Sequence, residues 1–374
     1  TSFQEALRVL EQGLSIFQGA DTSTSNAAGR LLLAMGTMYM DRGDFKGAVE
    51  RLSQVSEMTF SSLEVRVAAL EALIGLHLRM HQDVTASQFG DTCLHLLENA
   101  EAKMDEETLQ ALKMRTKAVK GLVELARGHV DSAESCFLGF HADNIRKSKN
   151  GLGAVALSYA EFVHVTGNLA LAKQMYELAI ELSGTKDSHD MQVPAAAAMV
   201  SEDVQLGAAF GLGQLAIHTG NFDEAEQRLT EVLKKAEEHY GGHNYKVGII
   251  LSRIADMFGH KGRSEGANYF FIQEGLYRRA LEMLKAPALE QQVTPTEIDL
   301  RDVIALVRGS YAQLLSHQHS RVGEAQKMRE WADVVWSNNR MSLAKVLENI
   351  ETLTNEETKT YVILVTDMRL GRVF

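Results

Sequence analysis

Apolar and small residues recur at helical spacing along most of the chain. Between Ala208 and Val232 they predict two amphipathic helices joined by a tight turn at Gly220-Asn221. The apolar face of this pair consists of Leu212, Gly213 and Ala216 in the first helix and of Phe222, Ala225, Leu229 and Val232 in the second. The pattern is therefore that of a helix–turn–helix unit.

The same unit recurs elsewhere in the chain. A small residue in the first helix precedes an alanine in the second by 12 residues in four places: Gly36 and Ala48, Gly121 and Ala133, Ala160 and Ala172, and Gly213 and Ala225. Turn glycines recur at a period near 42, as between Gly220 and Gly262. A degenerate pair is expected at Val65 to Met80 and Thr85 to Leu97, where the turn HQDV has no glycine. Such self-similarity indicates a repeat array.

The repeats divide the chain into three predicted parts. Residues 1–25 form an N-terminal helix and loop, residues 26–340 the repeat array, and residues 341–374 a C-terminal capping helix and tail. The tail contains TYVILVTD, which is compatible with a strand or a buried helix. A helix is favoured because no other predicted strand is present to pair with it. Because the last repeat needs a cover, residues 358–374 are expected to fold back onto Val322–Leu353 or to form a subunit contact.

One repeat departs from the common length. Six residues are inserted around Ala267 to Ile272, after the glycine expected at the turn, Gly262. The insertion contains three consecutive aromatic residues, Tyr269, Phe270 and Phe271. Successive helical residues point about 100° apart, so one helix face cannot bury all three. We expect at least one of them to pack on a neighbouring repeat or on a partner.

The repeat units resemble those of the tetratricopeptide-repeat superfamily, in which small residues lie where the two helices cross. The matching positions are Gly36, Tyr39 and Ala48; Gly121, Ala133 and Phe137; Ala160, Ala172, Tyr176 and Ala179; Leu212, Gly213 and Ala225; and Ile254, Ala255 and Phe258. The segment EEHYGGHNYKVGIILSRIADMFGHKGR, followed by LYRRALEML, is similar to the repeats of kinesin light chains. The resemblance implies an all-α, right-handed superhelical solenoid of about seven helix pairs with terminal capping helices.

The resemblance also implies a partner-binding groove lined by the first helix of each pair. The residues expected to face it are Leu33, Thr37, Met40, Leu157, Glu161, Phe210, Gln214, Ile217, Ser252 and Asp256. In chaperone-binding members a Lys and Asn clamp holds an acidic tail. Here Thr37, Glu161, Gln214 and Asp256 stand where the clamp Asn would stand, which disfavours that ligand. A mixed apolar and acidic groove suits an amphipathic helix or a basic segment. Some of these residues are expected instead to be buried by a superhelical turn or by the chain's own tail.

Composition narrows the classes of partner. The chain has 374 residues and a net charge of −11, which argues against broad nucleic-acid binding. Cys93 and Cys136 form no CxxC motif, so reduced thiols in an intracellular protein are expected. No apolar run approaches the roughly 20 residues that span a bilayer. The chain begins at Thr1 rather than Met, which indicates removal of a preceding residue or segment. A soluble protein of the cytoplasm, or of an organelle interior after transit-peptide removal, is expected.

Candidate chemistry is sparse. Gly151–Ala156 and Gly211–Ala216 match the nucleotide fingerprint GxGxxA, but neither follows a predicted strand, and helix crossing already explains their small residues. His164, His218, His260 and His317 recur near the ends of first helices, where we expect successive repeats to hold them too far apart for a metal site. A pH-sensitive rim is the alternative for these histidines. We expect no catalytic, cofactor or metal site and no enzyme activity.

The predicted function is that of a protein–protein interaction scaffold or adaptor. It would bind a partner peptide or helix in the concave groove, in assembly of a larger complex. The alternative is an oligomerising structural subunit that uses its ends and outer faces, including a homo-oligomer through the ends.

Overall fold

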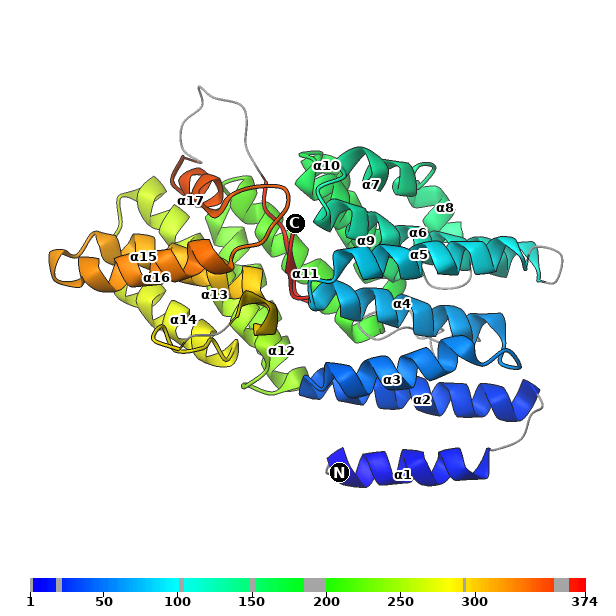
Figure 1. Ribbon diagram of the computed structural model, residues 1–374. Coiled ribbons are helices and arrows are strands. Elements are labelled where there is room, and N and C mark those ends of the chain that lie inside the picture. The colour runs from blue at the N-terminus through cyan, green and yellow to red at the C-terminus, as the bar shows by residue number, and fades with distance from the viewer. Residues whose placement is uncertain are drawn as a thin grey trace. The chain divides into compact units, whose positions relative to one another are not determined.

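The computed structural model describes residues 3–17, 22–100, 104–147, 152–184, 200–291, 294–352 and 363–374. Within these ranges seven antiparallel helix pairs follow one another along the chain (Figure 1). They are α2 (Thr22–Arg42) and α3 (Phe45–Glu57), α4 (Leu63–Arg79) and α5 (Asp83–Glu98), α6 (Glu106–Ala126) and α7 (Val130–Phe137), α9 (Gly153–Val165) and α10 (Leu169–Ser183), α11 (Ser201–His218) and α12 (Phe222–Tyr240), α13 (Tyr245–Glu265) and α14 (Phe270–Met283), and α15 (Arg301–Ser316) and α16 (Val322–Val335). The all-α helical-repeat architecture is confirmed, including the degenerate pair α4–α5.

The remaining elements lie outside the pairs. Helix α1 (Phe3–Ile16) precedes them, α8 (Ala142–Lys147) follows α7, and α17 (Leu343–Thr352) follows α16. Two short 3-10 turns span Pro295–Glu297 and His319–Arg321. The chain ends with strands β1 (Thr366–Asp367) and β2 (Arg372–Val373), which pair antiparallel.

The turns inside four pairs share one backbone conformation. Gly43, Gly128, Gly167 and Gly220 have φ angles of +79°, +83°, +87° and +72°. This region is open to glycine without a steric penalty, which explains why the turn glycine recurs. The residue after each glycine closes the turn, as when the Asn221 N–H donates to the Ala216 carbonyl at 2.9 Å. In α4–α5, His81 adopts this conformation with φ +57°, so the turn forms without glycine.

Small residues lie where the two helices of a pair cross. A Cβ atom added to Gly36 would lie 2.8 Å from Leu52 Cδ2, and one added to Gly213 would lie 2.5 Å from Leu229 Cδ2. A Cβ at Gly211 would overlap the Tyr176 ring. Gly211 and Gly213 lie inside helix α11, so the second GxGxxA match serves helix packing. Gly151, in the first match, lies outside the described residues.

Enlarging a crossing residue should destabilise the fold. Ala225 is completely buried in α12. Ala225→Leu should lower the free energy of unfolding by about 1–3 kcal/mol, because added methyl groups in a packed core force neighbouring side chains out of position. Gln227→Leu, at an exposed position of the same helix, is the control. Denaturant melts in which the two variants are equally stable would show that the crossing is not at Ala225.

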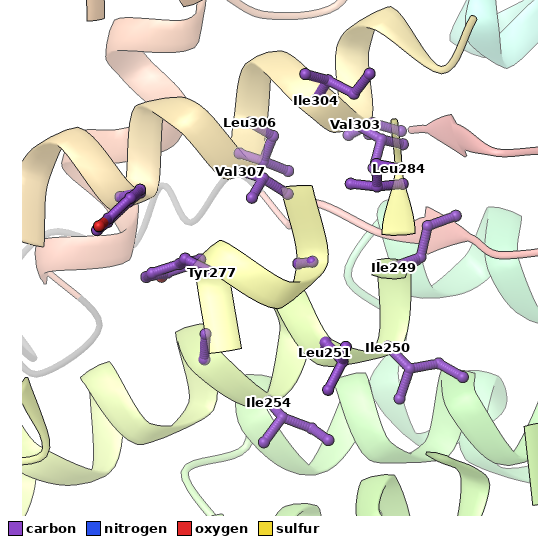
Figure 2. Packing of buried hydrophobic residues seen from close by; sticks show 14 of the residues in the cluster. Ile249, Ile250, Leu251, Ile254, Tyr277, Leu284, Val303, Ile304, Leu306 and Val307 are labelled. Carbon is purple, nitrogen blue, oxygen red and sulfur yellow. The ribbon is translucent and has the colours of Figure 1, made fainter. Parts of the chain in front are cut away.

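The chain divides into two compact units. Unit 1 comprises residues 1–125, 129–159 and 181–204, and unit 2 comprises 126–128, 160–180 and 205–374. The core of unit 1 includes Leu52, Leu73 and Leu97, from α3, α4 and α5. In unit 2, side chains of α13, α14 and α15 meet, among them Ile254, Tyr277 and Val307 (Figure 2).

The insertion predicted after α13 lengthens the helix and adds a loop. Helix α13 continues through Gly262 to Glu265, so the prediction of a turn at Gly262 is wrong. The helix ends instead at Gly266, which has φ +67°. Tyr269 packs on Phe258 of α13 with ring centroids 5.2 Å apart, whereas Phe271 is 84% exposed. An open cavity of about 460 Å³ lies beside this loop, between α13, α14 and α15.

The expectation of a helical tail is wrong for the described residues 363–374. They form a β-hairpin whose two strands pair with each other, so no third strand is required. Its strands lie beside α11 (Figure 1). The hairpin also packs on α15 and reaches the loop after α16, which lies within Val322–Leu353. Residues 358–362 lie outside the described part of the chain.

Candidate functional site

The hairpin of residues 363–374 is a small folded module buried among helices of unit 2. The N–H of Val365 donates to the Phe374 carbonyl at 3.0 Å, and the Phe374 N–H donates back at 2.8 Å. Between the strands the chain turns at Met368–Gly371, where Gly371 has φ +63°. Every residue from Leu364 to Phe374 is buried. The hairpin therefore satisfies some of its backbone hydrogen-bonding groups internally, and the other groups are left for the surrounding helices.

Three side chains of unit 2 hold the hairpin by its backbone. The carboxamide of Gln214, on α11, accepts from the Thr366 N–H at 2.9 Å and donates to the Thr366 carbonyl at 3.0 Å. The Tyr245 hydroxyl donates to the Arg369 carbonyl at 3.3 Å, and Asn338 Nδ2 donates to the Val373 carbonyl at 2.8 Å. Together with Glu161 and Asp302 these residues are called the hairpin site below.

Glu161, on α9, supplies a buried negative charge to the hairpin site. Its Oε2 lies 2.8 Å from Nη2 of Arg369, and the same guanidinium lies 2.9 Å from Asp367 Oδ2. All three side chains are almost fully buried. Burial raises the pKa of Glu161 well above its ordinary value, and the charge of Arg369 works in the opposite direction. Arg369 is thus the cation that makes two buried carboxylates tolerable.

Asp302 supplies a second buried carboxylate, from α15. Its Oδ1 accepts from the N–H and the hydroxyl of Ser337, both at 2.9 Å. Burial raises the pKa of Asp302, and the positive charge of Arg372 on β2 opposes that rise. The two arginines of the hairpin therefore face carboxylates on two different first helices.

The structure distributes the ten predicted groove residues between the two units. Leu33, Thr37, Met40 and Leu157 belong to unit 1, and Glu161, Phe210, Gln214, Ile217, Ser252 and Asp256 belong to unit 2. Thr37 and Met40 are half-buried, and the other eight are buried. Glu161 and Gln214 meet at the hairpin. Asp256 instead accepts from the Tyr277 hydroxyl at 2.6 Å, and Ser252 donates within α13 to the Ile249 carbonyl at 2.7 Å.

Truncating Gln214 should lower the stability of the protein substantially. If Gln214 were instead a groove residue that faces solvent, the same change would leave the stability nearly unaltered. Gln214→Ala leaves the buried N–H and carbonyl of Thr366 without their partner, and each such group costs about 1–3 kcal/mol. We expect the free energy of unfolding to fall by about 2–4 kcal/mol in urea melts. Thr37→Ala is the control, since the half-buried Thr37 hydroxyl donates to the Leu33 carbonyl of its own helix. Equal stability of the two variants would contradict this role for Gln214.

Two of the four recurring histidines meet, contrary to expectation. His164 Nε2 and His218 Nδ1 lie 2.8 Å apart, and His164 Nδ1 lies 3.1 Å from the Tyr176 hydroxyl. Neighbouring first helices pack closely enough for imidazoles at equivalent positions to touch. Burial lowers the pKa of His218 to about 4 and that of His260 to about 3. Among the described residues, no group of three His, Cys, Asp or Glu side chains could hold a metal ion.

The buried histidines should make stability fall in mild acid. His260 is neutral in both states above pH 6.5; below that pH the unfolded chain takes up a proton that the folded protein refuses down to about pH 3. The free energy of unfolding therefore falls by about 1.4 kcal/mol for each pH unit below 6.5, or by about 2 kcal/mol at pH 5. His260→Gln should remove this part of the difference in unfolding free energy between pH 7 and pH 5. Parallel pH profiles for the two proteins would refute the assignment.

One cluster brings together residue types found in hydrolases. Ser87 Oγ donates to Glu124 Oε1 at 2.8 Å, and Glu124 Oε2 lies 3.1 Å from His129 Nδ1. Because the carboxylate stands between hydroxyl and imidazole, the imidazole does not contact the serine as a general base must. Burial also raises the pKa of the Cys93 thiol to about 12, which disfavours the nucleophilic thiolate. The geometry around Ser87 and the raised pKa of Cys93 therefore both disfavour a nucleophilic role.

Sequence reasoning did not find Tyr245, Asp302 and Asn338, nor the hairpin itself. A signal for the hairpin is present: apolar residues flank the segment Asp367–Gly371, which begins with a turn-favouring aspartate and ends with the glycine of positive φ. Arg369 and Arg372 within an otherwise apolar run are the second signal, because buried cations need carboxylate partners. No local signal marks the partners, which come from distant helices.

No family model matches the chain, and no curated protein matches it. Among solved structures, the chain is similar to BtubC (BKLC) from P. vanneervenii, with 12% identity, a TM-score of 0.41, and coverage of 75% of this chain and 93% of that chain. It is also similar to a tetratricopeptide repeat protein from Parabacteroides merdae, with 13% identity, a TM-score of 0.40, and coverage of 87% and 98%. The helix pairs of the chain itself define its class, an all-α helical repeat. No described helix is long and apolar enough to cross a membrane.

Proposed function

We propose that this protein is an interaction scaffold that binds polypeptide segments on its first helices, in assembly of a larger complex. The observation that carries the proposal is the hairpin site. Three of its side chains form hydrogen bonds to the backbone of a β-hairpin. The two strands of this hairpin pair with each other and not with any part of the described helices. Bonds to backbone atoms do not depend on the side chains of the segment, so the same surface chemistry suits segments of other proteins.

The accessible part of the first-helix surface offers the test. Thr37 and Met40 are half-buried on α2 of unit 1, so they tolerate substitution better than the buried residues of unit 2. Affinity purification followed by mass spectrometry would compare the wild type with a Thr37→Lys, Met40→Glu variant. We expect the variant to lose partners that the wild type captures while its far-ultraviolet circular dichroism shows that it remains folded, since Met40 packs only partly on the unit 1 core. Retention of every partner would contradict binding at this surface.

A second candidate function has its own observation. Helix α1 has no fully buried residue, and it leaves Val9 64% and Ile16 75% exposed two turns apart on one face. Such a face favours an oligomerising subunit that associates through its end. The variant Val9→Glu, Ile16→Glu should then lower the mass measured by light scattering. Loss of partners from this variant, but not from the Thr37 and Met40 variant, would favour the second function over the first.

A further inference from the structure

The hairpin of residues 363–374 contacts unit 2 in the manner of a docked ligand. Its two strands bond to each other, and the side chains of Gln214, Tyr245 and Asn338 bond to its backbone at Thr366, Arg369 and Val373, respectively. No strand of the described residues continues the two-stranded sheet. The interface therefore combines side-chain bonds to the hairpin backbone with burial of hairpin side chains in the core of unit 2, and a second segment of like shape can reproduce both.

The charges of the hairpin site define which segment fits. Glu161 lies on the helix side, and its cation Arg369 is 208 positions away in the sequence. The Arg369 guanidinium binds Glu161 through Nη2 and Asp367 through both Nη2 and Nε, at 2.8, 2.9 and 3.3 Å. A planar fork of donors makes these bonds together, whereas a lysine ammonium is a compact point charge. Glu161 thus selects arginine, and a carboxylate two residues earlier in the segment orients it.

A second carboxylate extends the match. Strand β2 packs on α15, and the charge of its Arg372 acts on Asp302 of that helix. At both contacts the helices supply a carboxyl group, Glu161 or Asp302, and the hairpin supplies an arginine. The remaining large side chains of the module are apolar, and all of them except Ile363 are buried. The complement of the site is therefore an apolar hairpin that carries an Asp-x-Arg sequence and a second arginine three residues later.

We propose that the hairpin site is an arginine-selective docking site, at which a partner protein's segment of this chemistry replaces the chain's own residues 363–374. Glu161 and Asp302 are its specificity-determining residues. The inference rests on the proposed function, and it adds the site and the class of partner. In the absence of the partner, the chain's own hairpin covers the site and keeps its carboxylates paired.

The test uses the full chain and a fluorescent synthetic peptide with the sequence of residues 363–374. Arg369→Gln in the protein weakens the internal hairpin, so the peptide should bind this variant roughly tenfold more tightly than the wild type in anisotropy titrations. A peptide with lysine at that position should bind roughly tenfold more weakly. Adding Glu161→Gln to the protein should abolish the preference for arginine over lysine. Arg329→Gln, which removes a surface ion pair with Asp333, is the control and should bind like the wild type.

Hydrogen exchange of the wild type tests the same inference without a substitution. The free energy of the opening that lets the amides of Val365 and Phe374 exchange should be lower than that of the opening that exposes the amide of Ile254 in α13. Equal protection of these three amides, or equal binding of the peptide by the wild type and by folded Arg369→Gln protein, would overturn the proposal. A dimer that the peptide converts to monomer would also overturn it and assign the site to a second copy of the chain.

The two proposals fail in different ways. If the peptide does not bind but partners depend on Thr37 and Met40, the scaffold function stands and the docking site does not. If the peptide binds with the expected preference but the Thr37 and Met40 variant keeps every partner, the docking site stands, and the unit 1 surface is excluded.

Discussion

Removal of residues 363–374 should leave a protein that keeps its helices but has lost much of the stability of unit 2. The hairpin buries six large apolar side chains: Leu364, Val365, Met368, Leu370, Val373 and Phe374. Burial of each stabilises the fold by about 1.5–3 kcal/mol, offset in part by the entropy of ordering the segment. The loss is largest here because the truncation also exposes the apolar faces of the helices around it. We expect a melting temperature lower by about 10 °C or more.

Circular dichroism and dye binding would report this result. Far-ultraviolet ellipticity should stay near the wild-type value at 20 °C, because α13 packs directly on α14 and α15 directly on α16. Binding of a hydrophobic dye should rise. A matched pair of variants serves as the control: Phe374→Ala removes a completely buried ring and should cost about 3–5 kcal/mol, whereas Phe271→Ala removes an exposed ring at little cost. Unchanged melting and dye binding after truncation would show that the hairpin does not cover the core.

The repeat architecture could be predicted because it depends on local rules. Turn glycines with positive φ and small residues at helix crossings recur at fixed spacing in the sequence. In the pair α11–α12, Gly213 is the small residue at the crossing and Gly220 is the turn glycine. The turn at His81 shows the limit of such marks: a histidine takes the same backbone conformation, and only the neighbouring periods reveal the pair.

The site depends on contacts that spacing does not encode. Gln214 and Glu161 could be placed on first helices, but their partners Thr366 and Arg369 lie 152 and 208 positions away. A run such as VILVT suits a helix or a strand equally well, so only the choice of partners decides its structure. The assumption that a strand needs a partner elsewhere failed, because the segment pairs with itself. The contact of His164 with His218 was missed because side-chain reach across neighbouring repeats was underestimated.

Substitution of Arg369, the cation that the hairpin offers to Glu161, by methionine should strongly destabilise the protein. Methionine keeps an unbranched apolar stem like that of arginine but leaves the buried Glu161 carboxylate without its cation. Breaking one side of a buried ion pair costs about 3–5 kcal/mol. Asp367 keeps hydrogen bonds from the N–H groups of residue 369 and Leu370, so Glu161 bears most of the cost. Adding Glu161→Gln should therefore recover part of the lost stability.

The pH dependence separates this explanation from a simple loss of packing. Burial already raises the pKa of Glu161, and removal of the opposing Arg369 charge raises it further. A carboxyl whose pKa is higher in the folded state takes up its proton more readily there, so the penalty shrinks as the pH falls through the folded pKa towards the unfolded value near 4.5. The difference in unfolding free energy between wild type and Arg369→Met should thus be largest near pH 8 and smaller near pH 5. Arg329→Met, which breaks only an exposed pair on α16, should cost less than about 1 kcal/mol at either pH. A cost for Arg369→Met that does not change with pH would mean that Glu161 does not depend on Arg369 for its charge.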